Sequence, residues 1–261
     1  MFKQFALSAL ILAFAASLTQ AKVQTKEIEY KDGDVELQGF LAWDDAQQGK
    51  RPGVLVVHEW WGHDDYARSR AKQLAELGYV AFALDMYGEG KLTEHPKQAG
   101  EWAGQIRANT AAWQKRALAG LEILKQQPQV DPEKLAAIGY CFGGSTALQL
   151  AFAGADLDAV VSFHGALPVP TPEQAEAAKA SILVCHGAED GFIPEETAQK
   201  FRAALDKAGA DYQMVYYAGA KHSFTVPHAN ERGIDGIAYN RAADQRSWAQ
   251  MQQLFDEVFS R

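Results

Sequence analysis

The stretch LAAIGYCFGG, residues 135–144, decides how this chain folds. It opens with apolar residues typical of a buried strand and continues into glycines and small residues typical of a helix start. Cys141 lies at the junction, with Gly139 two residues before it and Gly143 two residues after it. A strand that turns this sharply into a helix lifts the central side chain clear of the sheet and points the helix N-terminus at it. The stretch therefore predicts a nucleophile elbow that carries a cysteine.

The partners that such a nucleophile needs follow later in the chain. A hydrolase with this elbow has its acid after one later strand and its histidine after the next. One apolar run leads into the loop that holds Asp190, and the next leads to His222. We expect Asp190, rather than its neighbour Glu189, to orient the imidazole of His222, which would act as the base. A nearby imidazole and a helix N-terminus raise the thiolate fraction of a cysteine, whose ordinary pKa is about 8.5.

The order of apolar and amphipathic segments predicts an α/β fold. Residues 23–30 and 35–43, separated by KDGD, are typical of an antiparallel hairpin. Buried strands are expected at residues 53–58, 79–84, 135–138, 157–163, 181–185 and 212–217. Helices are expected at residues 65–77, 92–127, 142–152, 195–207 and 240–259. This alternation indicates a doubly wound, mostly parallel sheet with an N-terminal antiparallel hairpin, and it puts functional residues in loops at the carboxyl ends of the strands.

Residues 1–21 have the features of a secretory signal peptide. Lys3 supplies the positive start, residues 5–18 are apolar, and small residues stand at the expected cleavage point. The apolar part is shorter than the roughly 20 residues that a membrane span needs. We therefore expect cleavage of this segment to leave residues 22–261 as a single α/β domain, periplasmic or secreted and without a stable membrane anchor.

The composition narrows the partners of the protein. The 261 residues carry 25 basic and 33 acidic side chains, a formal net charge of −8, so nucleic acid is not an expected partner. We expect a monomer that acts on a small molecule. Of the two cysteines, Cys185 ends an apolar run and is expected to be a buried structural thiol. A disulfide between it and Cys141 would silence the nucleophile, and the sequence leaves their separation open.

A metal or cofactor is not expected. Residues His58, His63, Asp64 and Asp65 have the side-chain types that bind metals, but the chain has no i,i+4 histidine pair on a helix to support a zinc site. We also find no phosphate-binding loop of the Walker type. His58 and His164, both near strand ends, are expected to be structural.

Four segments together resemble the dienelactone hydrolase family, which comprises cysteine-dependent members of the α/β-hydrolase fold. They are GYCFGG at residues 139–144, GAED at 187–190 with Pro194 after it, HSF at 222–224 and VHEWWG at 57–62. The resemblance extends over about residues 35–259. It implies an esterase or lactonase of the carboxymethylenebutenolidase type.

The resemblance also implies roles for residues beside the triad. Glu59 would contact the thiol of the nucleophile and help to deprotonate it when substrate arrives. The backbone N–H groups of Phe142 and Trp60 would form the oxyanion hole. The side chains of Trp61 and Tyr87 are expected to contact the substrate.

The chain departs from the family pattern at two positions. Family enzymes that act on dienelactone hold the substrate carboxylate with arginines, where this chain has Gly88 and Val226. A carboxylate buried without a cation costs several kcal/mol. We therefore expect the substrate to be neutral, or to be anchored by another basic residue such as Arg68, Lys91 or Arg241.

Two alternatives to ester hydrolysis stay open at this point. The missing arginines are compatible with a ligand-binding protein on a hydrolase scaffold that has lost turnover, because fold does not fix function. The same residues could also cleave a thioester or a peptide, and no sequence feature separates these reactions from ester cleavage.

Overall fold

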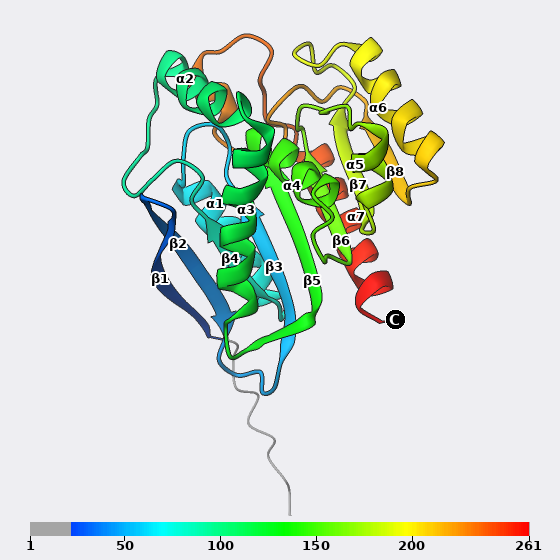
Figure 1. The fold of residues 1–261 in the computed structure, drawn as a ribbon. Coiled ribbons are helices and arrows are strands. Elements are labelled where there is room, and N and C mark those ends of the chain that lie inside the picture. Colours follow the sequence, from blue (N-terminus) through cyan, green and yellow to red (C-terminus); the bar gives the residue numbers. More distant parts are fainter. Residues whose placement is uncertain (1–21, 261) are drawn as a thin grey trace, which may run out of the picture.

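The structure, a computed structural model, describes residues 22–260, so the expected signal peptide lies outside the described residues. Its centre is an eight-stranded sheet with the strand order β1-β2-β4-β3-β5-β6-β7-β8 (Figure 1). The strands are β1 (Val23–Asp32), β2 (Val35–Asp44), β3 (Arg51–Val57), β4 (Val80–Leu84), β5 (Val130–Tyr140), β6 (Ala159–Phe163), β7 (Ser181–Gly187) and β8 (Tyr212–Tyr217).

The sheet is mostly parallel, which confirms the fold expected from the sequence. Strands β1 and β2 form an antiparallel hairpin that joins the sheet through an antiparallel pairing of β2 with β4. Every other pairing, from β4 across to β8, is parallel. Every residue of β4, β6 and β7 is buried, because helices cover both faces of a sheet of this type.

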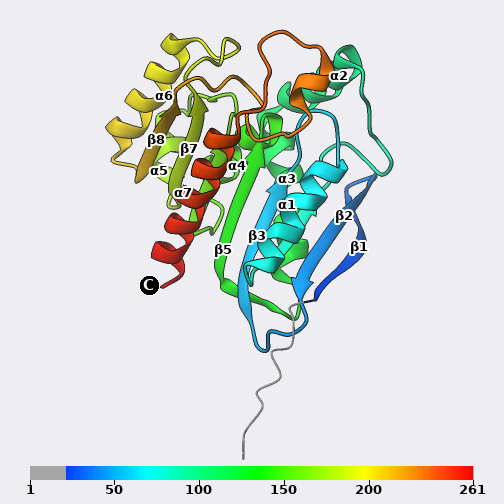
Figure 2. The ribbon, with the colours of Figure 1, turned by 180° about the vertical axis from the view of Figure 1, so that it is seen from behind.

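Helices cover both faces of the sheet. They are α1 (Asp65–Glu76), α2 (Pro96–Arg107), α3 (Thr110–Lys125), α4 (Phe142–Phe152), α5 (Pro172–Ala177), α6 (Glu195–Ala208), α7 (Arg241–Phe259) and the 3₁₀ helix Ala229–Arg232. Helices α1 and α7 lie on one face and α3 to α6 on the other (Figures 1 and 2). Two apolar clusters fill the two interfaces, one containing Leu121 of α3 and the other Met251 of α7. No helix within residues 22–260 combines the length and the apolar character that crossing a membrane requires.

The segment expected to be helical, residues 92–127, is mostly helical, but the chain breaks there into two helices, α2 and α3. The break lies at Asn109, which has extended backbone angles and whose side chain accepts a hydrogen bond from the Ala112 amide at 3.1 Å. Asparagine at this N-cap position stabilises a new helix start by about 1 kcal/mol, so it ends one helix and begins another. Strand β5 also begins earlier than expected, at Val130, where it pairs with the start of β3.

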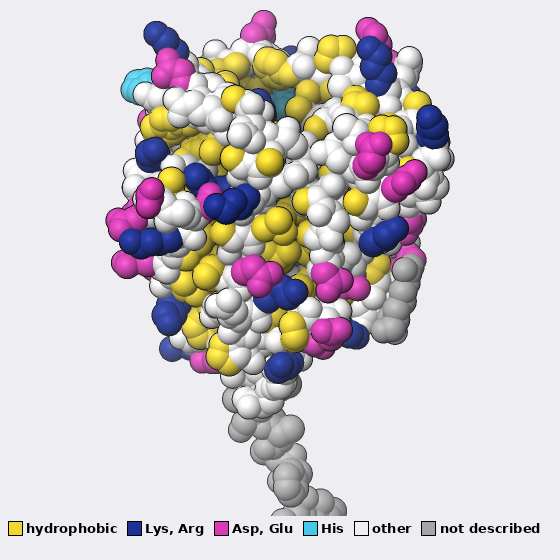
Figure 3. Space-filling model, in the orientation of Figure 1, with side chains coloured by type: hydrophobic (Ala, Val, Ile, Leu, Met, Phe, Trp, Pro, Cys, Tyr) yellow, Lys and Arg dark blue, Asp and Glu magenta, His cyan; other side chains and the backbone are white. Residues whose placement is uncertain are grey.

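The topology leaves a crevice at one edge of the sheet. From β3 the chain passes to β4 on one side of it and then to β5 on the other side, so the loops that follow β3 and β5 diverge. Glu59 comes after β3 and Cys141 after β5, while Asp190 and His222 come after β7 and β8. The space-filling view shows hydrophobic side chains around a hollow at this end of the molecule, at the top (Figure 3).

Candidate active site

Cys141 occupies a strained turn between β5 and α4. Its backbone angles are φ 53° and ψ −113°, in a region that residues other than glycine rarely adopt and that costs about 1–3 kcal/mol. The flanking glycines make the turn possible: a Cβ at Gly139 would lie 2.0 Å from the Gly143 oxygen, and one at Gly143 would lie 2.2 Å from the Val57 oxygen. The cysteine is partly exposed while most of its surroundings are buried. The elbow thus presents a sulfur atom at the N-terminus of an 11-residue helix.

His222 and Asp190 form a hydrogen-bonded pair next to this sulfur. The Nδ1 atom of His222 lies 2.7 Å from Oδ2 of Asp190, and both side chains are buried. Burial lowers the pKa of His222, but the charges of the Cys141 and Asp190 side chains outweigh it and raise that pKa to about 10. His222 makes its direct hydrogen bond to Asp190, and the Cys141 sulfur raises the pKa of His222 mainly through its charge. Glu189, the neighbouring carboxylate, is exposed.

Glu59 is buried below the same edge of the sheet. Its Oε1 atom accepts a hydrogen bond from the Ser223 hydroxyl at 2.9 Å. Burial and the nearby Asp64 carboxylate raise the pKa of Glu59 to about 7, against the lowering effects of His222, Ser223 and Arg232. A group with this pKa can hold or release a proton near neutral pH. Ser223, which has a φ of 55°, therefore contacts the Glu59 carboxyl, a role that was not expected from the sequence.

The two backbone amides expected to form the oxyanion hole follow strands β5 and β3, which are neighbours in the sheet. Phe142 is the first residue of α4, where amides have no acceptor within the helix. Trp60 lies in the loop after β3, and its carbonyl accepts a hydrogen bond from the Tyr87 hydroxyl at 3.2 Å. The ring of Tyr87 is buried against the rings of Phe142 and His58, at 5.4 Å and 5.0 Å between centroids. Tyr87 therefore supports the loop that carries Trp60.

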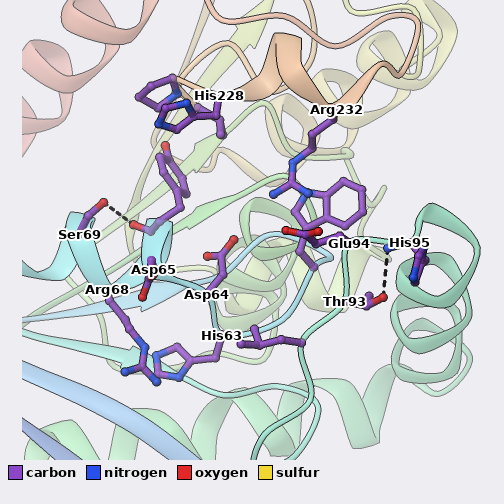
Figure 4. Close-up of a pocket in the computed structure, with 15 residues that line it drawn as sticks. His63, Asp64, Asp65, Arg68, Ser69, Thr93, Glu94, His95, His228 and Arg232 are labelled. Carbon is purple, nitrogen blue, oxygen red and sulfur yellow. Dashed lines mark hydrogen bonds between the residues drawn. The ribbon is translucent and has the colours of Figure 1, made fainter.

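A cavity of about 980 Å³ lies beside these groups. It is lined by Trp61, His63, Asp64, Asp65, Tyr66, Arg68, Ser69, Leu92, Thr93, Glu94, His95, Val226, Pro227, His228 and Arg232 (Figure 4). Cys141 and His222 are not among these lining residues, but Asp64 and Arg232 both act electrostatically on Glu59, so the cavity adjoins the site. Trp61, expected from the sequence to contact substrate, forms part of its wall.

One basic residue of this cavity was not anticipated from the sequence. The guanidinium of Arg232 lies over the ring of Trp61, 4.0 Å from its centroid, and no carboxylate among residues 22–260 is within ion-pair distance of it. Of the basic residues considered beforehand, Arg68 is paired with Glu27 at 2.5 Å and Lys91 borders a separate small cavity. Arg241 is exposed at the start of α7.

The second cysteine is separate from the site. Cys141 and Cys185 are both free thiols, so the structure answers the question of a disulfide that the sequence left open. Burial raises the pKa of the Cys185 thiol to about 12, and the Tyr217 hydroxyl donates to its sulfur at 3.7 Å. Within the described part of the chain, no group of three or more histidine, cysteine or acidic side chains is arranged to hold a metal ion.

Comparisons with known proteins agree with this architecture. The model of the dienelactone hydrolase family matches residues 37–259. The chain is 30% identical over 239 residues to the protein usf of Aquifex pyrophilus, covering 89% of this chain and 98% of that protein.

Two solved structures are also similar. The structure named m3DLH superposes with a TM-score of 0.88 at 44% identity, covering 90% of this chain and 98% of that one. The dienelactone hydrolase-like promiscuous phosphotriesterase P91, from metagenomic libraries, gives a TM-score of 0.89 at 40% identity, covering 92% of this chain and 99% of that one. The chain is a hydrolase that belongs to the dienelactone hydrolase family.

Proposed function

We propose that the protein hydrolyses carboxylic esters or lactones through a thioester intermediate on Cys141. The observation that carries this proposal is the His222–Asp190 hydrogen bond of 2.7 Å beside a sulfur raised on a strained elbow. An imidazole held in this way can share the thiol proton and stabilise the thiolate, which is the reactive form of cysteine.

The reaction has two halves. The Cys141 thiolate attacks the acyl carbon, and the amides of Phe142 and Trp60 hydrogen-bond the oxyanion that forms. The oxyanion collapses to a thioester as the C–O bond breaks, and the imidazolium of His222 gives its proton to the leaving alkoxide. Water then attacks the thioester while His222 takes its proton, and cleavage of the C–S bond releases the acid and restores the thiolate and the imidazolium.

Asp190 and Glu59 have different parts in this scheme. Asp190 fixes the orientation of His222 and favours its protonated form, because the carboxylate accepts from Nδ1. Glu59, with its pKa raised to about 7, helps to deprotonate the Cys141 thiol when substrate arrives, before the first attack, and His222 carries the proton in the later steps. The hydroxyl of Ser223 holds Glu59 in place.

The substrate arm that does not react is proposed to lie in the 980 Å³ cavity. Trp61 and Val226 supply apolar wall there, and Arg232 supplies a cation that lacks an ion-pair partner among the described residues. Val226 stands where family enzymes that act on dienelactone have an arginine, so a negatively charged arm would have to be anchored by Arg232. The carboxylates of Asp64 and Glu94 also point into this space (Figure 4). Because they offset the charge of Arg232, neutral arms should be accepted as well.

A phosphotriesterase activity is a second candidate. It is supported by the 40% identity to P91, a protein named as a dienelactone hydrolase-like promiscuous phosphotriesterase. Attack of the same thiolate on phosphorus would require the same two amides and the same imidazole.

We also propose that the enzyme is exported to the periplasm or secreted, and that residues 22–261 are its mature single domain. The signal-like sequence of residues 1–21 supports this proposal.

The test compares three proteins on one panel of substrates. Wild type, Cys141→Ala and Cys185→Ala are assayed with aryl esters and lactones that have a neutral or an acidic arm, and with an aryl phosphotriester. We expect Cys141→Ala to abolish turnover, and the matched control Cys185→Ala to keep it. Equal turnover by wild type and Cys141→Ala would end the proposal. A stable acyl adduct on wild type without turnover would instead indicate a ligand-binding protein.

A further inference from the structure

His164, at the end of β6, contacts three groups of the candidate site. Its Nδ1 atom accepts a hydrogen bond from the backbone N–H of Cys141 at 3.2 Å, and it lies 3.9 Å from Oε1 of Glu59. Its ring meets the ring of His222 edge to face, with 5.4 Å between centroids. The side chain is fully buried, so these contacts are not exchanged with water.

The other side of the His164 ring begins a chain of buried polar groups. Its Nε2 atom lies 2.7 Å from Oγ1 of Thr225, which in turn lies 2.6 Å from the hydroxyl of Tyr66. The Nε atom of Arg70 donates to that hydroxyl at 3.1 Å, and Arg70 forms an ion pair of 2.5 Å with Asp244 of α7. Hydrogen bonds therefore connect the nucleophile elbow to the helix that closes the chain.

The backbone on both sides of this contact is strained. Cys141 has φ 53° and His164 has φ 41°, and neither is a glycine. Such residues cost about 1–3 kcal/mol each and persist only where the surroundings hold them in place. The Cys141 N–H is shared between the Phe163 carbonyl, at 3.0 Å, and Nδ1 of His164, at 3.2 Å. With Nδ1 as an acceptor, the neutral ring carries its proton on Nε2 and donates it to Thr225.

The charge state of His164 agrees with this arrangement. Burial, together with the positive charges of His222 and Arg70, lowers the pKa of His164 well below its ordinary value. A neutral ring keeps the Nδ1 lone pair free for the Cys141 amide. It also adds no second imidazolium that would compete with His222 for the thiolate.

We propose that His164 is a positioning residue, which fixes the backbone of Cys141 so that the sulfur faces His222 and the Phe142 amide faces the oxyanion. This inference rests on the proposed role of Cys141 as the nucleophile. His164 is not among the residues that line the cavity, so its loss should lower kcat and leave KM nearly unchanged. Misplacing a reacting group by about 1 Å costs on the order of 100-fold in rate.

Two substitutions at this position separate its two contacts. The amide oxygen of His164→Asn can occupy the place of Nδ1 and accept from Cys141, and asparagine tolerates a positive φ. The longer side chain of His164→Gln instead reaches toward Thr225 and leaves the Cys141 amide without its side-chain acceptor. We expect His164→Gln to lose about 10- to 100-fold in kcat, and His164→Asn to keep most of the wild-type value.

The experiment measures kcat and KM with an aryl ester for both variants in a Cys185→Ala background. It also measures the rate at which iodoacetamide alkylates Cys141 from about pH 5 to about pH 9, where thiolates react. We expect slower alkylation near neutral pH in His164→Gln, with His164→Asn closer to wild type. Wild-type kcat and alkylation in His164→Gln, or an effect confined to KM, would overturn the proposal.

A third variant protects the test against misfolding. Thr225→Val removes the hydroxyl that holds Nε2 and keeps the side-chain shape, and circular dichroism checks that each variant is folded. If His164→Gln does not fold, a lower kcat at unchanged KM in Thr225→Val supports the inference, and wild-type values there overturn it. Alkylation needs only a thiol, so it tests His164 even if Cys141→Ala were to retain turnover and disprove the proposed function.

Discussion

The imidazole of His222 is held by Asp190 at 2.7 Å, although the two residues are 32 positions apart and follow different strands. The second oxygen of Asp190 accepts from the backbone N–H of Phe192 at 3.0 Å, so the carboxylate is fixed as well. Because Nδ1 faces the acid, Nε2 is the nitrogen left for the reacting groups. The imidazole of His222, which follows β8, therefore lies between the carboxylate after β7 and the sulfur after β5.

Replacing Asp190 by asparagine should remove most of the activity. Asp190→Asn keeps the shape but loses the charge and favours the wrong tautomer of His222, so we expect kcat to fall by about 10³- to 10⁴-fold. Glu189→Gln is the matched control, since that carboxylate is exposed, and it should stay near wild type. Steady-state kinetics on an aryl ester checks both. Equal losses in the two variants would count against Asp190 as the acid.

Glu59 should make stability depend on pH in a defined direction. Its pKa is raised from 4.5 to about 7 by burial, so the folded state is most favoured below about pH 4.5 and loses that contribution as pH rises through 7. Glu59→Gln keeps an oxygen for Ser223 and removes the buried charge. We expect it to gain up to about 3 kcal/mol over wild type at about pH 8.5 and little at about pH 5. Urea unfolding at the two pH values measures the difference; a gain of the same size at both would contradict it.

Arg232 should govern the response to substrate charge. We expect Arg232→Gln to raise KM for an ester with a carboxylate arm by about tenfold, the worth of one charge-assisted hydrogen bond, and to affect the neutral analogue less. Arg68→Gln is the control, because that guanidinium is already paired with Glu27. Kinetics on the two esters checks this. A larger effect from Arg68→Gln would show that the anchor had been assigned to the wrong arginine.

Gly143, two residues after Cys141, should not tolerate a methyl group. Gly143→Ala would bring a Cβ to 2.2 Å from a backbone oxygen of β3, so we expect a loss of more than about 3 kcal/mol or no folded protein. Gly104→Ala in α2 meets nothing within 4 Å and should stabilise the protein by about 0.5–1 kcal/mol. Thermal unfolding compares them. A folded Gly143→Ala with wild-type stability would contradict the geometry of the elbow.

Local patterns were enough to predict the sheet and the elbow. A buried parallel strand leaves a continuous apolar run, and the glycines around Cys141 meet a steric demand that is visible in five residues. The break between α2 and α3 was missed because Asn109 is an ordinary polar residue inside a helical pattern. Only the hydrogen bond between the Asn109 side chain and the Ala112 amide shows that a new helix begins there.

The contacts around the site depend on tertiary structure. Arg232 ends the 3₁₀ helix Ala229–Arg232, ten residues beyond His222, and no motif indicates that its side chain lies over Trp61. His164 was expected to be structural, since a histidine at a strand end has no spacing relationship to Cys141. Its positive φ and the bond to the Cys141 amide appear only when β5 and β6 are paired.

The measurement that tests the central claim most directly is intact-protein mass spectrometry of enzyme quenched during turnover of an aryl ester. We predict an added mass of one acyl group on Cys141, which appears no more slowly than turnover and decays when the ester is consumed. The same adduct should accumulate in Asp190→Asn, where deacylation is slowed. Full turnover with no acyl group on Cys141, or with the acyl group on another residue, would contradict the account.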